Sequence, residues 1–276
     1  MKGLWVSNQI MRRLFFERII IALRIYPIIS LFSTLRSVKQ VSWNYDGQDW
    51  LCKRISDSYI IYTHRFQMDA NKLFKLNNRI FEKVYKTKKG DVVFDIGVGN
   101  GVDTKYWSES VGEEGLVYLV EPDPNCFRRL KKLIDKNFLN NVRLINVALS
   151  NYEGFSRLTN FDNPGKNWLL DTSNDSYTDN PLVRVTTIAK VIESENLDSI
   201  DFCKVNIEGE EVHFLEGAET AIDVIKNWSI SCHDFLGTNY ATFSRVREKL
   251  EKAGYICKEF DHLDPIEKYY LYANKP

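Results

Sequence analysis

The stretch that decides the fold is Val92-Val93-Phe94-Asp95-Ile96-Gly97-Val98-Gly99-Asn100-Gly101. Its first half is a largely apolar run, as expected of a strand buried on both faces of a parallel sheet. Its second half is rich in glycine, which adopts positive φ and lets a ligand approach the backbone without a clash at Cβ. A helix can follow over residues 103–111. The stretch therefore predicts a strand, a turn and a helix, and the turn either binds a ligand or is merely tight.

The same alternation of strands and helices continues along the chain. We expect strands at 117–120, 142–149, 202–207, 229–233, 255–260 and 268–273, and helices over 124–136, 187–195, 211–226 and 241–253. Residues 155–185 are polar and irregular, with short strands at most. Strand–helix alternation with short links predicts an α/β fold with a doubly wound, Rossmann-like sheet and helices on both faces. Ligands of such sheets bind at the carboxyl ends of the strands, near the switch point.

A different pattern precedes this domain. Residues 41–45 and 50–55 flank Asp46-Gly47, a dipeptide suited to a tight turn, and predict a β-hairpin. Residues 66–87 show helical spacing of apolar residues. We therefore expect a helical and hairpin extension over residues 1–65 and the α/β domain over residues 66–276.

The first 40 residues are basic and rich in Leu, Ile and Phe. They hold seven basic residues against Glu17 alone, a net charge of +6. The longest uncharged stretch, 25–35, is shorter than the roughly 20 apolar residues that span a bilayer, and Pro27 would break or kink a helix. Two interpretations stay open. Residues 1–35 form a helix packed on the domain or on a partner, or a basic amphipathic helix that lies on an anionic membrane.

Composition excludes several classes of function. Lys plus Arg equals Asp plus Glu, 37 each, so the whole chain offers no field that would attract nucleic acid. No C-x-x-C occurs among the five cysteines, so we expect neither a metal site nor a disulfide framework, and a reducing cytoplasm as the compartment. The cysteines are Cys52, Cys126, Cys203, Cys232 and Cys257.

The glycine spacing and one acidic residue limit the classes of ligand that the loop can bind. A dinucleotide fingerprint G-x-G-x-x-G would need glycine where Val102 stands, and no Gly-Lys-Ser/Thr follows as in a P-loop. Glu121 ends the second strand, 20 positions after Gly101, where an acid can accept both hydroxyl hydrogens of a ribose. That contact suits any adenosine cofactor. The alternative is a carboxylate that starts the next helix, a role that suits Asp123 better than Glu121.

An ordered set of blocks resembles the class I methyltransferases, and specifically the FkbM family. The resemblance covers residues 88–275 and leaves residues 1–65 unmatched. The blocks are residues 91–104, 111–122, 146–154, Val183-Arg184-Val185-Thr186-Thr187-Ile188, and Lys204-Val205-Asn206-Ile207-Glu208-Gly209-Glu210-Glu211 with Leu215-Glu216-Gly217-Ala218.

The resemblance implies S-adenosylmethionine as cofactor and methyl transfer to oxygen on sugars, lipids or secondary metabolites. It implies that Asp95 and the loop of Gly97, Gly99 and Gly101 hold the methionine part of the donor. It assigns the ribose to Glu121, and the border of the adenine to Asn146, Val147 and Ala148. Two departures matter. Asn206 stands where the family usually has Asp, which counts against a base or metal role at this position. Ile188-Ala189 stands where the family usually has Leu-Asp.

Methyl transfer to a hydroxyl requires alignment of the donor with the acceptor and a group that accepts the hydroxyl proton. A sulfonium donor is already activated, but an alcohol must lose its proton, so a base or a cation helps. Candidates at strand ends are Lys204, Asn206 and Glu208, which share one face, and His233 on the next strand. An unperturbed pKa of about 6.5 makes His233 the better base, with Glu208 orienting it or holding the sugar and Asn206 positioning the acceptor. The alternatives are a structural pair of Lys204 with Glu208, a helix-capping Glu208 and a packed His233.

We therefore expect an O-methyltransferase that acts on a hydroxyl of a sugar, glycolipid or secondary metabolite, in the cytoplasm or peripherally on the inner membrane face. Two other classes stay open. Because Asn206 replaces the usual Asp, the second class is a non-catalytic scaffold that binds an adenosyl ligand. A nicotinamide-dependent oxidoreductase is the third class, and Val102 and the downstream blocks count against it.

Overall fold

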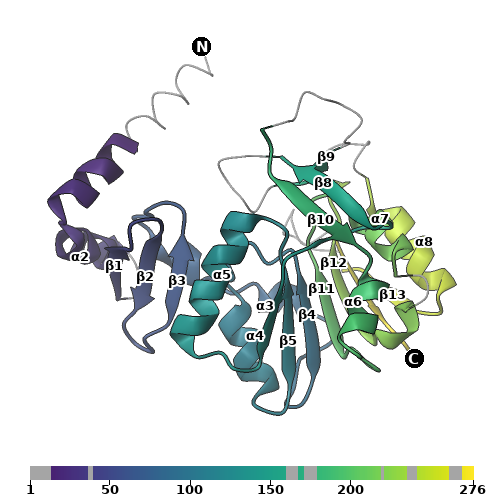
Figure 1. Cartoon of the computed structure of the whole chain (residues 1–276). Helices are drawn as coiled ribbons and strands as arrows, with labels where there is room; N and C mark the ends of the chain where they lie inside the picture. Colours follow the sequence, from purple (N-terminus) through teal and green to yellow (C-terminus); the bar gives the residue numbers. More distant parts are fainter. Residues whose placement is uncertain are drawn as a thin grey trace. The chain divides into compact units, whose positions relative to one another are not determined.

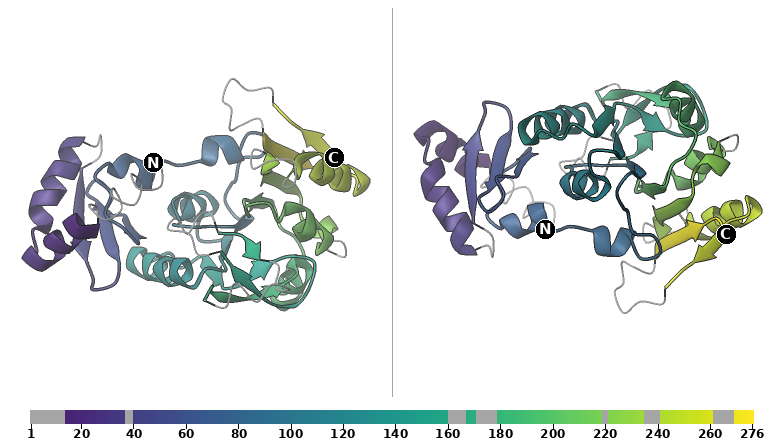
Figure 2. Two further views of the ribbon diagram at one scale, coloured as in Figure 1. Left: turned by 90° about the horizontal axis from the view of Figure 1, so that it is seen from above. Right: turned by 90° about the horizontal axis from the view of Figure 1, so that it is seen from below.

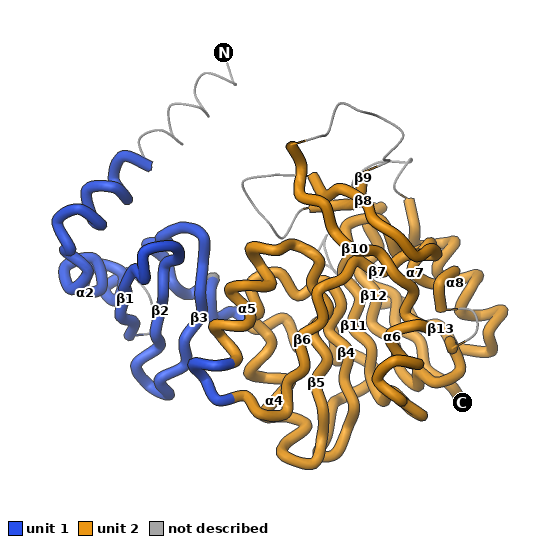
Figure 3. The backbone as a smooth tube through the Cα atoms, in the orientation of Figure 1, with its two compact units in different colours: residues 1–75, 135–138 blue, residues 76–134, 139–276 orange. Residues whose placement is uncertain are grey.

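A computed structural model describes residues 14–36, 40–159, 167–170, 179–218, 221–234, 241–260 and 269–276. Sequence-based expectations for residues 1–13 and for parts of 155–185 and 268–273 lie outside the described residues. The chain divides into two compact units (Figure 3). Unit 1 comprises residues 1–75 and 135–138, and unit 2 comprises residues 76–134 and 139–276. The predicted domain boundary between residues 65 and 66 stays a prediction.

Unit 1 contains helices and a small antiparallel sheet (Figure 1). After a helical stretch over residues 14–23, the elements are α2 (Tyr26–Arg36), β1 (Val41–Tyr45), β2 (Trp50–Arg54), β3 (Ile60–Thr63) and the 3-10 helix η1 (Ala70–Phe74). The strands pair in the order β1-β2-β3. Trp43, Trp50 and Phe66 meet edge to face or at a tilt in its core. The predicted hairpin is present, and β3 adds a strand that the sequence analysis did not expect.

The N-terminal helical segment breaks before Pro27. Arg24 has a positive φ of 51° between the two helical stretches, and Pro27 lies in the first turn of α2. Proline fits there because the backbone N–H groups of a first turn have no partner within the helix. The sequence analysis therefore identified a break correctly but placed it a few residues too late.

The prediction of a helix over residues 66–87 is wrong. The chain forms only η1 and the short α3 (Asn78–Phe81). Asp69 caps η1, and the backbone is extended again at Lys75. After α3, the Glu82 carboxylate accepts hydrogen bonds from the backbone N–H and hydroxyl of Thr87, which holds a turn in place of a continued helix.

The main sheet of unit 2 has the strand order β13-β14-β12-β11-β4-β5-β6 (Figure 1). Its neighbours are parallel from β12 to β6, whereas β14 runs antiparallel to both β12 and β13. The strands are β4 (Val92–Ile96), β5 (Leu116–Val120), β6 (Val142–Ile145), β11 (Phe202–Val205), β12 (Asn227–Ser231), β13 (Ile256–Lys258) and β14 (Tyr270–Asn274). The expected doubly wound α/β sheet is confirmed.

Alternate residues of the central strands pack against helices on opposite faces. Val93 and Val117 lie in one core with Trp107 of α4, and Phe94 and Tyr118 lie in the other core with residues of α6, α7 and α8. Burial of both faces explains why β4 and β5 are largely apolar, with Asp95 as the one charged residue of the two strands. The helices are α4 (Thr104–Val111), α5 (Pro124–Asn137), α6 (Ile188–Ser194), α7 (Glu211–Glu216), the 3-10 helix η4 (Ile222–Val224) and α8 (Phe243–Lys252).

A second, four-stranded sheet has the order β7-β10-β8-β9. It consists of β7 (Ala148–Leu149), β8 (Gly154–Leu158), β9 (Leu169–Leu170) and β10 (Leu182–Thr186). The strand expected over 142–149 is in fact divided between the two sheets. The division falls at Asn146, whose side-chain amide donates to the carbonyls of Glu121 and Pro122.

The helix expected over 211–226 also ends early, after α7. A Cβ on Gly217 would lie 2.1 Å from the carbonyl oxygen of Ser150, so the chain passes too close to its neighbour for a larger residue. In the part of the chain that the structure describes, no helix is both long and apolar enough to cross a bilayer.

Candidate functional site

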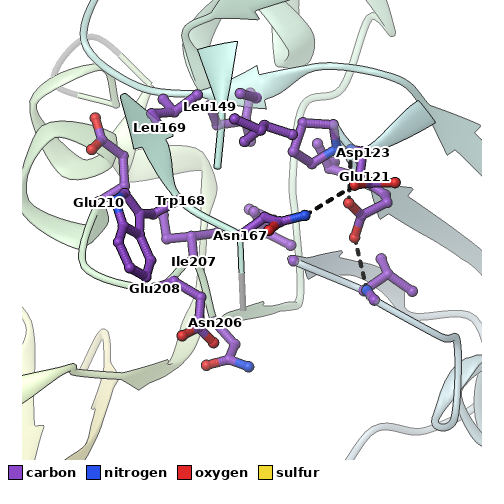
Figure 4. Close-up of a pocket in the computed structure, with 18 of the residues that line it drawn as sticks. Glu121, Asp123, Leu149, Asn167, Trp168, Leu169, Asn206, Ile207, Glu208 and Glu210 are labelled. Carbon is purple, nitrogen blue, oxygen red and sulfur yellow. Dashed lines mark hydrogen bonds between the residues drawn. The ribbon is translucent and has the colours of Figure 1, made fainter. Parts of the chain in front are cut away.

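A pocket opens at the carboxyl ends of β4, β5 and β11, bordered by residues of the second sheet (Figure 4). Its described lining residues are Ile96, Gly97, Val98, Gly99, Asn100, Val102, Val120, Glu121, Pro122, Asp123, Val147, Ala148, Leu149, Leu158, Asn167, Trp168, Leu169, Asn206, Ile207, Glu208 and Glu210. This is the edge at which parallel sheets of this topology bind ligands.

The glycine loop forms one wall of the pocket. Gly97 has a φ of +77°, and a Cβ there would lie 1.9 Å from the carbonyl oxygen of Asn206, so only glycine fits between the ends of β4 and β11. Gly99, also at positive φ, donates its N–H to Glu121 Oε2 at 2.8 Å. Gly101 does not line the pocket. A Cβ on it would lie 2.6 Å from Leu130, so this glycine serves the packing of α5.

Asp95 and Lys204 lie outside the pocket lining, behind the loop. Lys204 Nζ is 2.7 Å from Asp95 Oδ1, and both side chains are buried. The same ammonium donates to the carbonyl oxygen of Gly97 at 2.9 Å, while the indole N–H of Trp107 donates to Asp95 Oδ2. The pair therefore fixes the loop from behind. Lys204 does not pair with Glu208, which was the structural alternative considered for it.

Glu121 reaches the pocket from the end of β5. Burial raises its pKa to about 7, although hydrogen bonds from the backbone N–H groups of Asp123 and Gly99 act in the opposite direction. Each carboxylate oxygen accepts one of these bonds, Oε1 from Asp123 at 2.9 Å and Oε2 from Gly99. An ionised carboxylate oxygen can accept more than one hydrogen bond, so Glu121 can still receive the two hydroxyls of a ribose.

Asp123 caps the next helix, as the sequence predicts. Its Oδ1 accepts hydrogen bonds from the backbone N–H groups of Asn125 and Cys126, and its Oδ2 accepts one from Asn167. Of the three residues expected at the adenine border, Val147 and Ala148 line the pocket. Asn146 does not, because its amide holds the turn after β5.

The opposite side of the pocket follows β11 and contains Asn206, Glu208 and Glu210, facing Glu121 and Asp123 (Figure 4). Glu208 has a φ of +54°, and Gly209 after it one of +106°. A side chain with this backbone conformation is strained, and such strain concentrates at functional sites. The N-cap position of α7 is Glu210, so Glu208 does not cap this helix.

A buried histidine stands behind Glu208. His233 is 2% exposed, with Nε2 3.5 Å from Glu208 Oε1 and Nδ1 2.6 Å from Glu211 Oε1. Glu211 is fully buried and also accepts hydrogen bonds from the Gly209 N–H and the Thr242 hydroxyl. The three side chains form a row that begins at the pocket and ends in the core.

The charges around His233 change its expected role. Burial lowers the pKa of the imidazole, but hydrogen bonds and charges of Glu208 and Glu211 outweigh it and raise the pKa to about 9. His233 is therefore protonated near neutral pH, where an imidazolium cannot accept a proton. These charges count against the expected role of His233 as the base, which stays a prediction. Glu208 is the ionisable group of the row that lines the pocket.

Several lining residues had no signal in the sequence. Asn167, Trp168 and Leu169 come from the irregular segment in which no motif was found. Glu210 belongs to a recognised block but was not singled out. Its carboxylate accepts a hydrogen bond from the Ser150 hydroxyl at 2.6 Å.

The lining is acidic. Four carboxylates contribute to it, and none of the lining residues in the described part is lysine or arginine. In addition, the Asn100 side-chain oxygen is buried without a hydrogen-bond partner. A buried acceptor of this kind is costly unless a ligand donates to it. The pocket thus suits a ligand that carries positive charge and hydrogen-bond donors.

Comparison with known proteins finds matches to methyltransferases. The sequence model described as the methyltransferase FkbM domain matches residues 95–257. A protein-L-isoaspartate O-methyltransferase of Fervidobacterium nodosum is 33% identical over 76 residues, which are 26% of this chain and 38% of that protein. A fibrillarin-like rRNA/tRNA 2'-O-methyltransferase of Pyrobaculum aerophilum is 33% identical over 72 residues, 26% of this chain and 31% of that protein. The matches thus span about a third of the length of these curated relatives.

Among solved structures, the methyltransferase FkbM of Methylobacillus flagellatus KT superposes with a TM-score of 0.49 and 17% sequence identity. The alignment covers 73% of this chain and 47% of that one.

Proposed function

The chain belongs to the FkbM family of methyltransferases, and on that premise we propose that it transfers a methyl group to a hydroxyl oxygen of a sugar, a glycolipid or a related small molecule. As a member of this family it is a methyltransferase, and we propose S-adenosylmethionine as its cofactor. The observation that carries the proposal is the position of the Glu208 carboxylate. Glu208 has a positive φ, lines the pocket opposite Glu121, and lies next to the buried His233.

The residues of the pocket fit this cofactor. Glu121 would hold the ribose hydroxyls, and Val147 and Ala148 would pack against the adenine. The backbone of the glycine loop and the unpaired oxygen of Asn100 would meet the methionine part, whose ammonium is a hydrogen-bond donor. The acidic lining suits the positive charge of a sulfonium. The family-based assignment has Asp95 hold the methionine part of the donor. Because the Asp95 carboxylate pairs with Lys204 outside the pocket lining, we propose that it supports the glycine loop instead.

The bound cofactor supplies an activated methyl group, and the chain supplies alignment and a place for the proton. Glu208 would accept the hydroxyl proton as the acceptor oxygen takes the methyl group that the bound cofactor supplies, and the demethylated cofactor would then leave. One oxygen of this carboxylate faces His233, whose imidazolium orients it, so the other is available to the hydroxyl. The Glu208 side chain is 18% exposed, which gives the proton a route to solvent. Asn206 cannot take the proton and would position the acceptor.

The acceptor class follows from the groups around Glu208. Asn206, Glu208 and Glu210 offer oxygen acceptors for several hydroxyls, and the Trp168 indole offers an apolar face for the ring of a sugar. A nucleic acid fits less well, because the described lining has no cationic side chain to meet phosphates. We propose a polyhydroxylated acceptor on these grounds.

The test is a methylation screen with S-adenosylmethionine that carries a labelled methyl group, offered glycan, lipid, protein and RNA fractions. The proposal expects label in glycans or glycolipids, at a carbon–oxygen linkage that survives mild base. Label on nitrogen, on a protein carboxyl as a base-labile ester, or on RNA alone would contradict it. The variant Glu216→Gln, outside the pocket, is the control for handling of the protein.

A further inference from the structure

Helix α2 in unit 1 has its polar side against its own sheet. The Ser30 hydroxyl accepts a hydrogen bond from the Trp43 backbone N–H at 2.8 Å. The Ser33 hydroxyl accepts one from the Trp43 indole at 3.1 Å and donates to the carbonyl oxygen of Met68 at 2.9 Å. Thr34 bonds to the backbone of Val41. Hydroxyls, together with the buried Ile29, thus attach the helix to the strands beneath it.

The large apolar side chains of α2 face away from that sheet. Ile28, Leu31, Phe32 and Leu35 are 52%, 59%, 53% and 72% exposed. Their spacing, i, i+3, i+4 and i+7, puts them in one stripe. A helix packed on a soluble domain shows the opposite arrangement, with the apolar stripe inward. Figure 2 shows the purple helices along one side of the strands of unit 1, with α2 in contact with β1.

The helical stretch before α2 adds further exposed apolar side chains to unit 1. Leu14, Phe15, Phe16 and Leu23 are also exposed, Phe15 by 67% and Leu23 by 65%. We call these four side chains and the stripe of α2 the apolar surface of unit 1. It holds half of all exposed large hydrophobic side chains among the described residues. Such a concentration marks an interaction surface, because soluble proteins scatter exposed apolar residues singly.

The charges beside this surface select the partner. Arg18, Arg24 and Arg36 are exposed, whereas Glu17, the acidic residue of the described helices, is buried. Exposed charge here is therefore positive throughout. Two copies of this surface would bring arginines against arginines, but an anionic lipid surface offers both an apolar layer and negative headgroups.

We propose that unit 1 docks on an anionic phospholipid bilayer. The apolar surface enters the boundary between headgroups and acyl chains, and Arg18, Arg24 and Arg36 meet the headgroups. No helix in the described residues is long enough to span, so the contact is peripheral. The inference goes beyond the proposed methyl transfer and does not depend on the acceptor.

The experiment is sedimentation of the full chain with vesicles of phosphatidylcholine alone or mixed with phosphatidylglycerol, at low and high salt. The double variant Leu31→Gln/Phe32→Gln removes the centre of the stripe. Phe155→Gln on β8 is the matched control, because Phe155 is 65% exposed and belongs to unit 2. Thermal unfolding and calorimetric binding of S-adenosylhomocysteine show that each variant is folded, whatever the acceptor proves to be.

Wild type and Phe155→Gln should sediment with the phosphatidylglycerol vesicles, more weakly at high salt. The double variant should partition at least about tenfold less, given the apolar area it removes from the membrane. Arg18→Gln should lower binding by about fivefold, and Arg245→Gln, an exposed arginine of unit 2, should not.

Wild type that stays in the supernatant with anionic vesicles would overturn the proposal, and so would a double variant that sediments like wild type. A second copy is the occupant if sedimentation velocity shows a wild-type dimer that the double variant abolishes, with no vesicle binding. That result would also overturn it.

Discussion

His233 Nε2 lies 3.5 Å from Glu208 Oε1, so a buried imidazolium stands directly behind the carboxylate that enters the pocket. On its other side the same ring is 2.6 Å from Glu211, which has no exposure to solvent. The cation thus serves two carboxylates with different environments. It orients the one at the pocket and compensates the charge of the one in the core.

Replacing His233 should destabilise the protein. His233→Gln leaves the buried Glu211 without its cation, and breaking a buried ion pair in this way costs about 3–5 kcal/mol. His213→Gln is the control, because His213 also contacts a glutamate but is half exposed. Urea unfolding at pH 7 measures both. Equal stability of the two variants would show that Glu211 does not need the imidazolium.

The raised pKa of His233 also predicts a pH dependence of stability. Its folded-state pKa of about 9 lies above the unfolded value of 6.5, so the native state binds the proton more tightly. The stabilisation is complete below pH 6.5 and is lost as the pH rises through about 9. Wild type should therefore lose unfolding free energy between pH 7 and pH 10, and His233→Gln should lose less. Parallel curves for the two proteins would refute the assignment.

Binding of S-adenosylhomocysteine should weaken in mild acid. Burial raises the pKa of Glu121 to about 7, and a protonated carboxyl accepts the ribose hydroxyls less well. The dissociation constant of wild type should rise by up to about tenfold per pH unit below pH 7 and level off above it. Glu121→Gln should bind about 1–3 kcal/mol more weakly at pH 8 and show a flat profile. Calorimetry from pH 5.5 to 8.5 measures this, with Glu113→Gln on the surface as control. An unchanged affinity in Glu121→Gln would contradict the assignment of Glu121 to the ribose hydroxyls.

The same pKa has a consequence for the ligand-free protein. The folded value lies above the unfolded value of 4.5, so Glu121 stabilises the fold below pH 4.5, and that contribution is lost as the pH rises through about 7. Glu121→Gln should remove this loss, and thermal unfolding of the ligand-free proteins at pH 6 and pH 8 compares them.

Gly97→Ala should disrupt the end of β4. It combines a positive φ with a Cβ 1.9 Å from the Asn206 carbonyl, and the backbone of both strand ends must move. We expect a loss of more than about 2 kcal/mol and no measurable cofactor binding. Gly90→Ala measures the loss of stability that comes from the positive φ alone, because Gly90 has a φ of +85° and an added Cβ would have no atom within 4 Å. It should cost about 1 kcal/mol and leave binding intact. Similar losses in both variants would mean that close approach at Gly97 is unimportant.

The fold was predictable where burial leaves a simple pattern. β4, β5 and β11 lie between two helical layers, and their apolar runs stand out without any knowledge of neighbours. The spacing over residues 66–87 misled, because its apolar residues Leu73 and Phe81 are buried in two short helices, η1 and α3, and not in one long helix. The division of residues 142–149 between two sheets depends on the Asn146 amide and the turn after β5, a contact between distant parts of the chain.

The site was predictable to the same extent. Gly97, Gly99 and Glu121 belong to a local pattern and line the pocket. Trp168 and Asn167 come from a segment without pattern, and only the fold brings them in. His233 illustrates the limit most clearly. Its expected role rested on an unperturbed pKa, whereas Glu208 and Glu211 raise that pKa. Glu211 belongs to the recognised block of residues 204–211 but was given no role there.

The most direct test of the account is the turnover of Glu208→Gln at saturating S-adenosylmethionine with the acceptor found in the screen. The variant keeps the size of the side chain but cannot take a proton. Glu216→Gln, outside the pocket, is the matched control. The account predicts that Glu208→Gln still becomes saturated with the cofactor but turns over about 10²- to 10⁴-fold more slowly than the control, with the methyl group on oxygen in every product. Turnover of Glu208→Gln within a few-fold of the control would contradict it.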